Sequence, residues 1–167
     1  MNDKIEKILE EGRKCQKRMA CIGPTGPTGP TGTSTTANSM NATNTAGSTI
    51  AVVVGGTTVP LPNNQVLDGF TVNGANEVFT VPATGTYMVT YRVSTTAALL
   101  MSSRVLRNGT ALSGSTFSPI ASIGTFTATT FATLTAGDTL QLQLFGLLGA
   151  AVLQGGNGAT LTVIRLA

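Results

Sequence analysis

Apolar and polar side chains alternate along two stretches in the second half of the chain. In residues 86–94 every second position carries a large apolar side chain: Tyr87, Val89, Tyr91 and Val93. In residues 139–145 the corresponding positions are leucines: Leu140, Leu142 and Leu144. Because a period of two places alternate side chains on opposite faces of an extended backbone, both stretches are predicted to be β-strands with one face in a core.

Turn signals separate further short apolar runs between residues 49 and 167. Asn-Gly pairs occur at 73–74, 108–109 and 157–158, and both residues of such a pair tolerate positive φ. The pair at 108–109 lies between two apolar-containing runs, as the turn of a hairpin does. About eight to ten strands fit into this length. We therefore predict an all-β sandwich or barrel over residues 49–167, which we call the head.

Two segments near the end of the chain, residues 145–153 and 161–166, are apolar at nearly every position. A strand that is apolar on both faces needs cover on both. Another subunit is the usual cover for the outer face of a sandwich, so we expect the head to form oligomers.

Residues 1–22 carry a seven-residue spacing that is typical of a coiled-coil seam. The two seam positions are occupied by Ile5, Gly12 and Met19 and by Ile8, Cys15 and Ile22. We predict an amphipathic helix that serves as an N-terminal anchor. A helix this short either frays alone in water or self-associates when copies are brought together.

Residues 23–32 place a glycine at every third position, and proline follows each of the first three. These glycines are Gly23, Gly26, Gly29 and Gly32. Only glycine fits at the axis of a collagen triple helix, and proline presets the polyproline II conformation. We predict a short triple-helical stem, with a stiff monomeric polyproline II spacer as the alternative. Residues 33–48 are rich in Ser, Thr, Asn and Ala and are predicted to be a flexible linker.

Composition excludes most side-chain catalysis. The 167 residues include two cysteines but no histidine and no tryptophan. A Ser-His-Asp triad, a Cys-His dyad and a His-rich or Cys-rich zinc site therefore lack the residues they need. We expect the protein not to be an enzyme, and we expect no catalytic residue, cofactor or metal.

Most charges lie in residues 1–20, and those of the head are few and dispersed. The head contains Asp68, Glu77, Asp138, Arg92, Arg104, Arg107 and Arg165. A nucleic-acid partner is not expected, because a phosphate-binding surface needs clustered cations. No membrane partner is expected either, since the longest apolar run, 147–153, is far shorter than the roughly 20 residues that span a bilayer. Residues 1–20 also lack the apolar core of a secretory signal, so we expect synthesis in a cytosol.

Three stretches of the head resemble strands of the complement and tumour-necrosis-factor-like jelly-roll superfamily. They are an F-x-V-P-x-x-G-x-Y strand entry at 79–87, a Gly-Asp strand at 136–142 and a closing strand at 157–166. With the Gly-Pro-Thr triplets in front of it, the head resembles the bacterial collagen-like glycoproteins of the spore surface, the exosporium. This resemblance implies a ten-stranded antiparallel jelly roll, a homotrimer, and synthesis in the mother-cell cytosol. The proline-rich leader of many members is absent, and residues 1–22 stand in its place. Their expected partner is a protein of the spore basal layer or of a spore appendage.

Two kinds of side chain are candidates for covalent chemistry in such a trimer. Cys15 and Cys21 would form interchain disulfides in oxidising surroundings; the alternatives are that they stay reduced or cross-link to a cysteine-rich partner. The triplet threonines, Thr25, Thr28 and Thr31, occupy the outward position of a triple helix. They are candidate O-glycosylation sites, and unmodified threonine is the alternative.

Four charged residues of the head invite a ligand interpretation. Asp138 follows Gly137, and no other carboxylate is close in sequence, so it is predicted to cap a turn rather than bind a metal. Arg92, Arg104 and Arg107 are predicted to hold solvated edge positions, with a trimer axis or an anionic ligand as the alternatives.

The function expected from these features is structural. The chain is predicted to form a trimeric collagen-like fibre or tip with a stable jelly-roll head, attached through its N-terminus to the spore surface or to a spore appendage. The alternative is an adhesin or receptor-binding tip, including that of a phage fibre, which binds a ligand through the trimeric head.

Overall fold

The computed structural model describes residues 2–18, 37–146 and 148–167. The chain divides into two compact units, Met1–Thr33 and Ser34–Ala167. Several residues singled out from the sequence lie outside the described ranges: Met19, Cys21, Ile22, Gly23, Gly26, Gly29, Gly32, Thr25, Thr28 and Thr31. The predicted triple-helical stem therefore stays a prediction.

The first unit contains α1 (Asn2–Arg18), so the predicted helix is present and continues through Gly12. Asp3 in its first turn is favourably placed at the positive end of the helix dipole. The seam residues Ile5 and Ile8 are exposed, and so is Leu9. An amphipathic helix gains most of its stability by burying its apolar stripe, which this helix does not do by itself.

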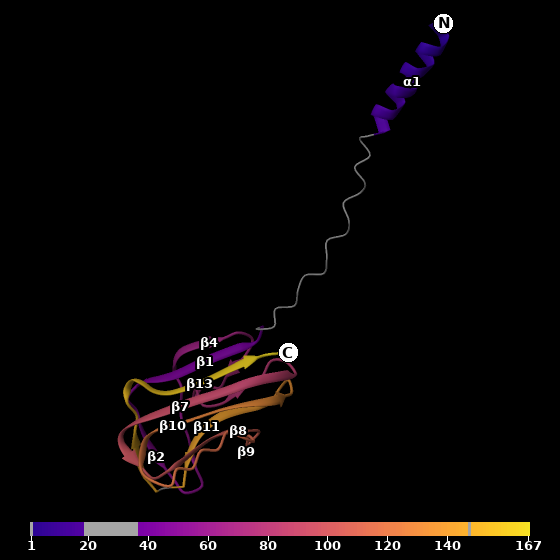
Figure 1. The fold of residues 1–167 in the computed structure, drawn as a ribbon. Coiled ribbons are helices and arrows are strands. Elements are labelled where there is room, and N and C mark those ends of the chain that lie inside the picture. The colour runs from indigo at the N-terminus through magenta and orange to yellow at the C-terminus, as the bar shows by residue number, and fades with distance from the viewer. Residues whose placement is uncertain (1, 19–36, 147) are drawn as a thin grey trace. The chain divides into compact units, whose positions relative to one another are not determined.

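The second unit is the head, two antiparallel sheets packed face to face with a small ribbon at one end (Figure 1). The five-stranded sheet contains, in order across it, β10 (Ile123–Leu134), β7 (Gly85–Leu99), β13 (Gly155–Arg165), β1 (Ser39–Ala46) and β4 (Asn63–Leu67). The six-stranded sheet contains β5 (Thr71–Val72), β6 (Phe79–Thr80), β11 (Thr139–Phe145), β8 (Ser102–Arg107) and β9 (Thr110–Ala111), with β3 (Thr57–Thr58) also paired to β11. The ribbon contains β2 (Thr49–Val52) and β12 (Gly149–Val152).

The described residues form thirteen strands, more than the eight to ten expected. Four of them, β3, β5, β6 and β9, have only two residues each. A two-residue strand is too short to show a hydrophobic period, so the sequence pattern does not reveal it.

The core confirms the alternation that the sequence shows. Tyr87, Val89, Tyr91 and Val93 of β7 are at most 2% exposed, and the three alternating leucines of β11 are fully buried. These two sets come from opposite sheets and form one hydrophobic cluster. The Tyr91 hydroxyl, which would be costly to bury alone, hydrogen-bonds to Ser103 Oγ at 2.8 Å and donates to the Ser115 carbonyl oxygen at 3.0 Å.

The predicted flexible linker over residues 33–48 is wrong for residues 39–46. These residues form β1, which pairs with β13 on one side and β4 on the other. Met40 and Ala42 are buried, and the amide of the buried Asn44 donates to the Pro60 carbonyl oxygen at 2.9 Å. Polar composition misled the sequence argument, because the partners that satisfy these groups are distant in the chain. The head therefore begins at Ser39 rather than at residue 49.

Two glycine-dependent features explain parts of the strand-entry and hairpin motifs. Asn108 and Gly109 have φ values of 50° and 78°, and they join β8 to β9 as a two-residue turn, as predicted. At Gly85, φ is not positive, but a Cβ atom would overlap the carbonyl oxygen of Ala167. Two residues further on, Tyr87 is buried and its hydroxyl donates to the Ala83 carbonyl oxygen at 2.7 Å.

The other two Asn-Gly pairs do not use positive φ. Near 73–74 the left-handed residue is Asn76, and near 157–158 it is Gly156. Gly158 is instead required by close approach, because a Cβ there would lie 2.7 Å from Leu153 Cβ. An Asn-Gly pair shows that the backbone can adopt positive φ nearby, but it does not show which residue of the turn adopts it.

The expectation of one strand apolar on both faces over residues 145–153 is also wrong. β11 ends at Phe145, Gly146 has a φ of 86°, and the chain continues as β12 in the ribbon. In 161–166, Leu161 and Val163 face the core while Ile164 is half-buried on the other side. The apolar run at 145–153 is therefore interrupted by the bend at Gly146, and the run at 161–166 is a strand that buries mainly one face.

The placement of β1 predicts effects of very different size on stability when aspartate replaces neighbouring residues in the full chain. Met40→Asp puts a carboxylate into the core and should lower the free energy of unfolding by at least about 3 kcal/mol. Asn41→Asp keeps an oxygen that accepts the Thr162 hydroxyl on the outer face, so its effect should stay within about 1 kcal/mol. Urea unfolding measures both. If both variants changed the free energy of unfolding by the same small amount, residues 39–46 would not be a strand with one buried face.

Candidate functional site

The outer face of the five-stranded sheet, turned away from the core, is rich in threonine. Register places these side chains in rows across β10, β7, β13 and β1, opposite in direction to the buried set. The outward residues are Thr125, Thr127, Thr129, Phe131 and Thr133 of β10; Thr86, Met88, Thr90 and Arg92 of β7; Thr160, Thr162 and Ile164 of β13; and Ser39, Asn41 and Thr43 of β1. We call this surface the threonine face.

Hydroxyl groups of the threonine face hydrogen-bond with one another and with the backbone. Thr90 Oγ1 lies 2.7 Å from Thr129 Oγ1, and Thr162 Oγ1 donates to Asn41 Oδ1 at 2.8 Å. Thr127 Oγ1 donates to the carbonyl oxygen of Tyr91 at 2.8 Å. Polar groups that are already paired cost little to remove from water. The face is therefore polar in composition but suited to burial.

Three apolar side chains lie side by side at one end of the threonine face. Phe131 is opposite Met88, and Met88 is opposite Ile164, so the three form a row across adjacent strands. Phe131 is 64% exposed, whereas Met88 and Ile164 are half-buried. We call these residues the apolar row. Val66 of β4, opposite Asn41, adds a further exposed apolar side chain at 63%.

The structure does not bring Arg92, Arg104 and Arg107 together. Arg92 is on the threonine face, where its Nε donates to Ser94 Oγ at 3.1 Å. Arg104 donates to Gln143 Oε1 at 2.7 Å, and its guanidinium carbon lies 4.2 Å from the centre of the Phe145 ring. Arg107 pairs with Asp138, the two groups 2.7 Å apart. Three arginines with separate partners do not form an anion site.

Asp138 caps a turn, as predicted. Its Oδ2 accepts the Thr135 N–H at 2.7 Å, and its Oδ1 accepts the Asn108 amide at 2.7 Å. Asn108 Oδ1 in turn accepts the Thr139 N–H, so one cluster links the β8–β9 hairpin to the start of β11. Burial raises the pKa of the Asp138 carboxyl, but hydrogen bonds and the Arg107 charge outweigh it. The pKa lies below its ordinary value of 3.8.

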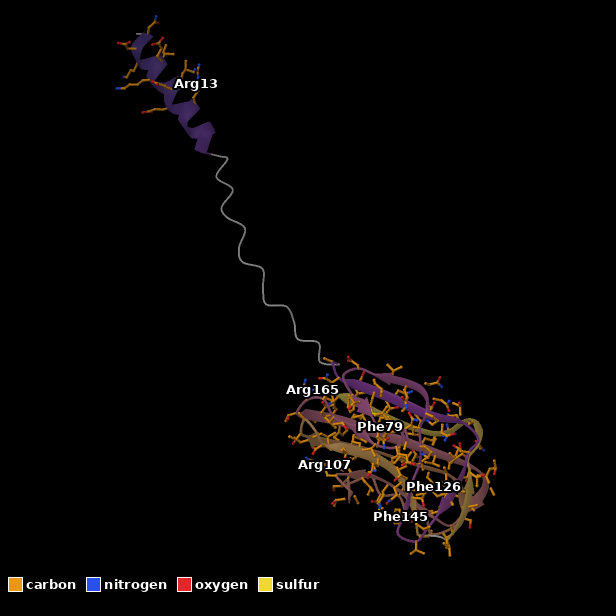
Figure 2. All side chains as sticks on the ribbon, turned by 180° about the vertical axis from the view of Figure 1, so that it is seen from behind. Arg13, Phe79, Arg107, Phe126, Phe145 and Arg165 are labelled. Carbon is orange, nitrogen blue, oxygen red and sulfur yellow. The ribbon has the colours of Figure 1, made fainter. Side chains whose placement is uncertain are left out.

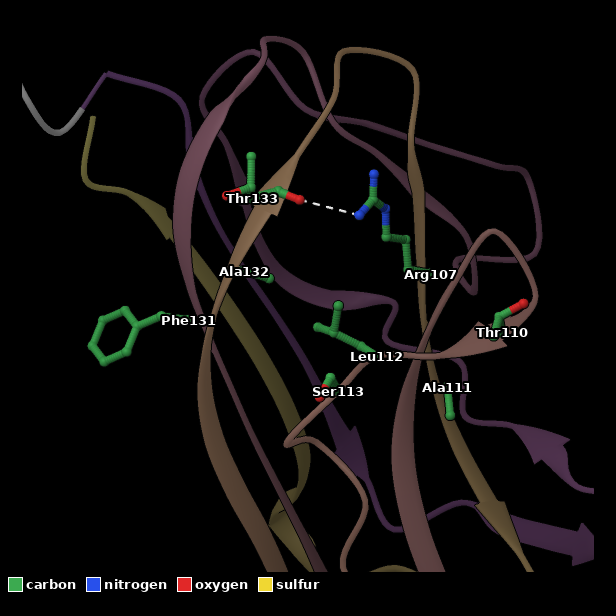
Figure 3. Close-up of a pocket in the computed structure, with 8 residues that line it drawn as sticks. All are labelled: Arg107, Thr110, Ala111, Leu112, Ser113, Phe131, Ala132 and Thr133. Carbon is green, nitrogen blue, oxygen red and sulfur yellow. Dashed lines mark hydrogen bonds between the residues drawn. The ribbon is translucent and has the colours of Figure 1, made fainter.

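A pocket of about 310 Å³ lies between β10 and the β8–β9 hairpin (Figure 3). Arg107 crosses it and donates to the Thr133 carbonyl oxygen at 3.1 Å. Figure 3 shows the Phe131 ring pointing away from the other lining residues. Because Arg107 is its only ionisable lining residue and is paired with Asp138, the pocket offers no free charge to select a ligand.

The remaining sequence candidates have no chemistry assigned by the structure. Of Cys15 only the backbone, inside α1, is described. Within residues 2–18, 37–146 and 148–167 no group of three His, Cys, Asp or Glu side chains could hold a metal ion. No helix among the described residues is long and apolar enough to cross a membrane.

Sequence reasoning missed the apolar row and the threonine face as a surface. The available signal was threonine at every second position from 125 to 129, followed by Phe131 two positions later. Such a run is typical of a strand with hydroxyl groups on one face. The intervening residues, Phe126 and Ala128, differ too much in size to indicate that the other face packs in a core.

The fold is that of a tumour-necrosis-factor-like jelly roll. The structure of rabbit GITRL is similar with a TM-score of 0.51 at 11% identity, covering 78% of this chain and 95% of that one. The structure of pika GITRL has a TM-score of 0.49 at 13% identity, covering 77% and 96%. At this identity the likeness shows the fold alone. A search of curated protein sequences found no match.

A family model identifies the chain more closely. The model of the BclA C-terminal domain matches residues 40–167. The chain therefore belongs to the BclA C-terminal domain family, and the matched region begins within β1. The predicted resemblance to collagen-like spore-surface proteins with a jelly-roll head is confirmed at the level of family and fold.

The Asp138 cluster predicts a pH-dependent loss of stability. Because the carboxyl has a lower pKa folded than unfolded, its ionised form stabilises the fold fully above about pH 4, and this contribution is lost as pH falls through the folded pKa. Asp138→Asn should therefore destabilise the head by about 1–2 kcal/mol near neutral pH and by less in acid. Thermal unfolding at several pH values measures the difference.

Glu77→Gln, which removes one carboxylate elsewhere in the head, is the matched control for that experiment. If both variants differed from the parent chain by the same amount at every pH, the Asp138 cluster would have no special role in the pH dependence.

Proposed function

We propose that this chain is a structural protein of the bacterial spore surface, in the exosporium or on a spore appendage, whose head assembles as a homotrimer. Membership of the BclA C-terminal domain family, which is associated with the exosporium, supports the location. The single observation that carries the assembly is the threonine face with its apolar row. The role is mechanical, with the head as a stable cap and no catalytic step.

The chemistry of the threonine face favours a contact with another copy of the head. An exposed phenylalanine beside a half-buried methionine and isoleucine gains free energy when it leaves water. Several hydroxyls of the face, those of Thr90, Thr129 and Thr162 among them, already have partners, so covering these leaves no unsatisfied group there. Arg92 is the only charged residue among the outward residues named above, so the desolvation cost of an assembled face is small.

A closed trimer repeats one heterologous contact, in which a patch of each copy meets a different patch of the next. β10 is one of the two edge strands of the five-stranded sheet, and Phe131 is on it. An edge strand of one head that packs across the face of its neighbour would bury Phe131 and cover the unpaired edge at once. Covering the unpaired edge of β10 is a second reason for assembly, in addition to apolar burial.

Residues 1–22 are proposed to attach the trimer to a protein of the spore basal layer or of an appendage. The exposed side chains of Ile5, Ile8 and Leu9 supply an apolar surface on α1. Their burial, either against copies of the same helix or against the attachment partner, would stabilise a helix that is marginal alone.

The mass of the head tests the trimer. We expect light scattering of residues 34–167 to give three times the mass of one head. Phe131→Arg should raise the dissociation constant by about 30-fold or more, since it places a charge inside the contact. Gln141→Arg is the control, because it introduces the same arginine side chain on the outer face of the other sheet. A head that is monomeric without substitution, or a trimer insensitive to Phe131→Arg, would contradict the proposed interface.

Covalent locking by cysteine is tested separately. If Cys15 and Cys21 form interchain disulfides, the oxidised full chain should run as dimers and trimers on a non-reducing gel and as one chain after reduction. Cys15→Ser and Cys21→Ser together should abolish these bands, whereas each alone should leave part of them. Monomers only, before reduction, would mean that the thiols stay free or serve another partner.

A further inference from the structure

The three Asn-Gly pairs of the head share a reaction as well as a turn tendency. The backbone nitrogen that follows an asparagine lies close enough to the side-chain Cγ to attack it and close a ring. Glycine in the following position leaves this nitrogen unshielded, because it has no Cβ. The pairs Asn73-Gly74, Asn108-Gly109 and Asn157-Gly158 have the same two residues. Differences in their reactivity therefore arise mainly from the fold.

The reaction has three structural requirements. The attacking N–H must not be held in a hydrogen bond, and the amide nitrogen that leaves must be able to take up a proton. The side-chain oxygen gains negative charge as the ring closes, so donors that contact this oxygen lower the barrier. The three pairs differ in how many of these requirements the fold meets.

The Asn73-Gly74 pair meets all three. Asn73 Oδ1 accepts two backbone N–H groups, from Glu77 at 2.9 Å and from Val78 at 3.1 Å. Within the part of the chain that the structure describes, neither Asn73 Nδ2 nor the Gly74 N–H has a hydrogen-bond partner. Both residues are exposed, and a Cβ at Gly74 would have no atom within 4 Å. The two donors form an oxyanion hole beside an open nucleophile.

The loop that carries Asn73 is ordered, so these donors are held in place. It joins β5 to β6, and the Asn73 N–H donates to the Val78 carbonyl oxygen at 3.0 Å. The Asn76 N–H donates to the Asn73 carbonyl oxygen, also at 3.0 Å. Phe79, directly after the loop, is fully buried inside the head (Figure 2). Donors fixed in this way need no rearrangement when charge develops on the oxygen, and this makes them effective.

The side chain of Asn108 is held at the group that would have to leave. Its Nδ2 donates to Asp138 Oδ1 at 2.7 Å, and its Oδ1 accepts the Thr139 N–H at 2.8 Å. Conversion of Asn108 to aspartate would also place a second carboxylate against Asp138, which is unfavourable for two like charges. We therefore expect this pair to react slowly, although both of its residues are exposed.

The glycine after Asn157 is enclosed. Gly158 is buried, and a Cβ there would lie 2.5 Å from the Gln154 carbonyl oxygen. Ring closure requires the backbone around Asn157 to rotate, and close packing leaves little room for this movement. Asn157 Oδ1 accepts the Thr160 hydroxyl at 3.0 Å, a single donor that is not part of the backbone. This pair is also expected to react slowly.

We propose that Asn73 is a self-modification site that converts to aspartate and isoaspartate in the folded protein. The Gly74 nitrogen gives its proton to a base of the solvent and forms a bond to Asn73 Cγ. The bond from Cγ to Nδ2 breaks, and the nitrogen takes up a proton and leaves as ammonia. Water then adds to one of the two carbonyl carbons of the succinimide ring. Opening of the ring leaves either an aspartate or an isoaspartate with a free carboxylate.

The product adds a charge at a position where the fold accommodates it. An aspartate at position 73 still offers an oxygen to the N–H groups of Glu77 and Val78, and hydrogen bonds to a charged acceptor are stronger. Three acidic and four basic residues give the head a net charge of +1, which the new carboxylate cancels. β5 and β6 belong to the six-stranded sheet, so the reaction does not depend on the threonine face or on trimer formation.

Peptide mapping of the full chain tests the proposal, with the three pairs as controls for one another. The chain is incubated in mildly alkaline buffer, once folded and once unfolded in urea, and is then digested with chymotrypsin. Phe70 and Phe79 flank the first pair, so its peptide is separate from those of the other two. Conversion raises the mass of a peptide by about 1 Da, and fragmentation locates the change. In the folded chain Asn73 should convert at least about tenfold faster than Asn108 and Asn157, and in urea the three rates should be similar.

The variant Asn73→Gln is the matched control. Its longer side chain forms a ring far less readily, so the mass change at position 73 should disappear while the other two pairs react as before. Equal rates for the three pairs in the folded chain, or a faster reaction at Asn108 or Asn157, would overturn the proposal. A preference for Asn73 that persists in urea would assign it to the sequence and not to the fold. No conversion of Asn73 in the folded chain would mean that the two donors immobilise the side chain instead of activating it.

Discussion

The structure of the head depends on the packing of alternate side chains between its two sheets. Tyr87, Val89, Tyr91 and Val93 from one sheet meet the leucines of β11 from the other, and all are buried. Because side chains alternate along a strand, burying these four side chains of β7 directs Met88, Thr90 and Arg92 to the opposite face. The threonine face is therefore a consequence of the core, and a register shift of one residue would exchange the two.

Neutrality is the second feature that the surfaces share. Hydroxyls replace charges on most of the threonine face, and elsewhere on the head Ile120 and Leu148 expose aliphatic side chains. The one ion pair among the described residues, Arg107 with Asp138, is part of a hydrogen-bonded cluster that holds a hairpin. This ion pair therefore stabilises local structure. The threonine face, with few charges, is suited to burial against another molecule rather than to electrostatic attraction.

The position of β1 relates the fold to attachment. It is the first strand of the head, and it is hydrogen-bonded on both sides, by β13 and β4. A load that reaches Ser39 from the preceding chain acts on a strand inside the sheet and not on an edge. The adjacent first and last strands also bring the C-terminal Ala167 to the start of β7, where Gly85 leaves room for its carbonyl group.

The local pattern by itself determined the all-β class, the amphipathic helix, the faces of β7 and β11, the Asn108-Gly109 turn and the capping role of Asp138. Each of these follows from interactions between residues close in sequence, so a short window contains its cause. Only the tertiary structure decided that residues 39–46 are a strand, that 145–153 turn into a ribbon, and that Phe131, Met88 and Ile164 form one row. These features rest on partners 20 or more positions away, such as Met40 with Val163, and short polar strands carry no hydrophobic period that would reveal such pairing.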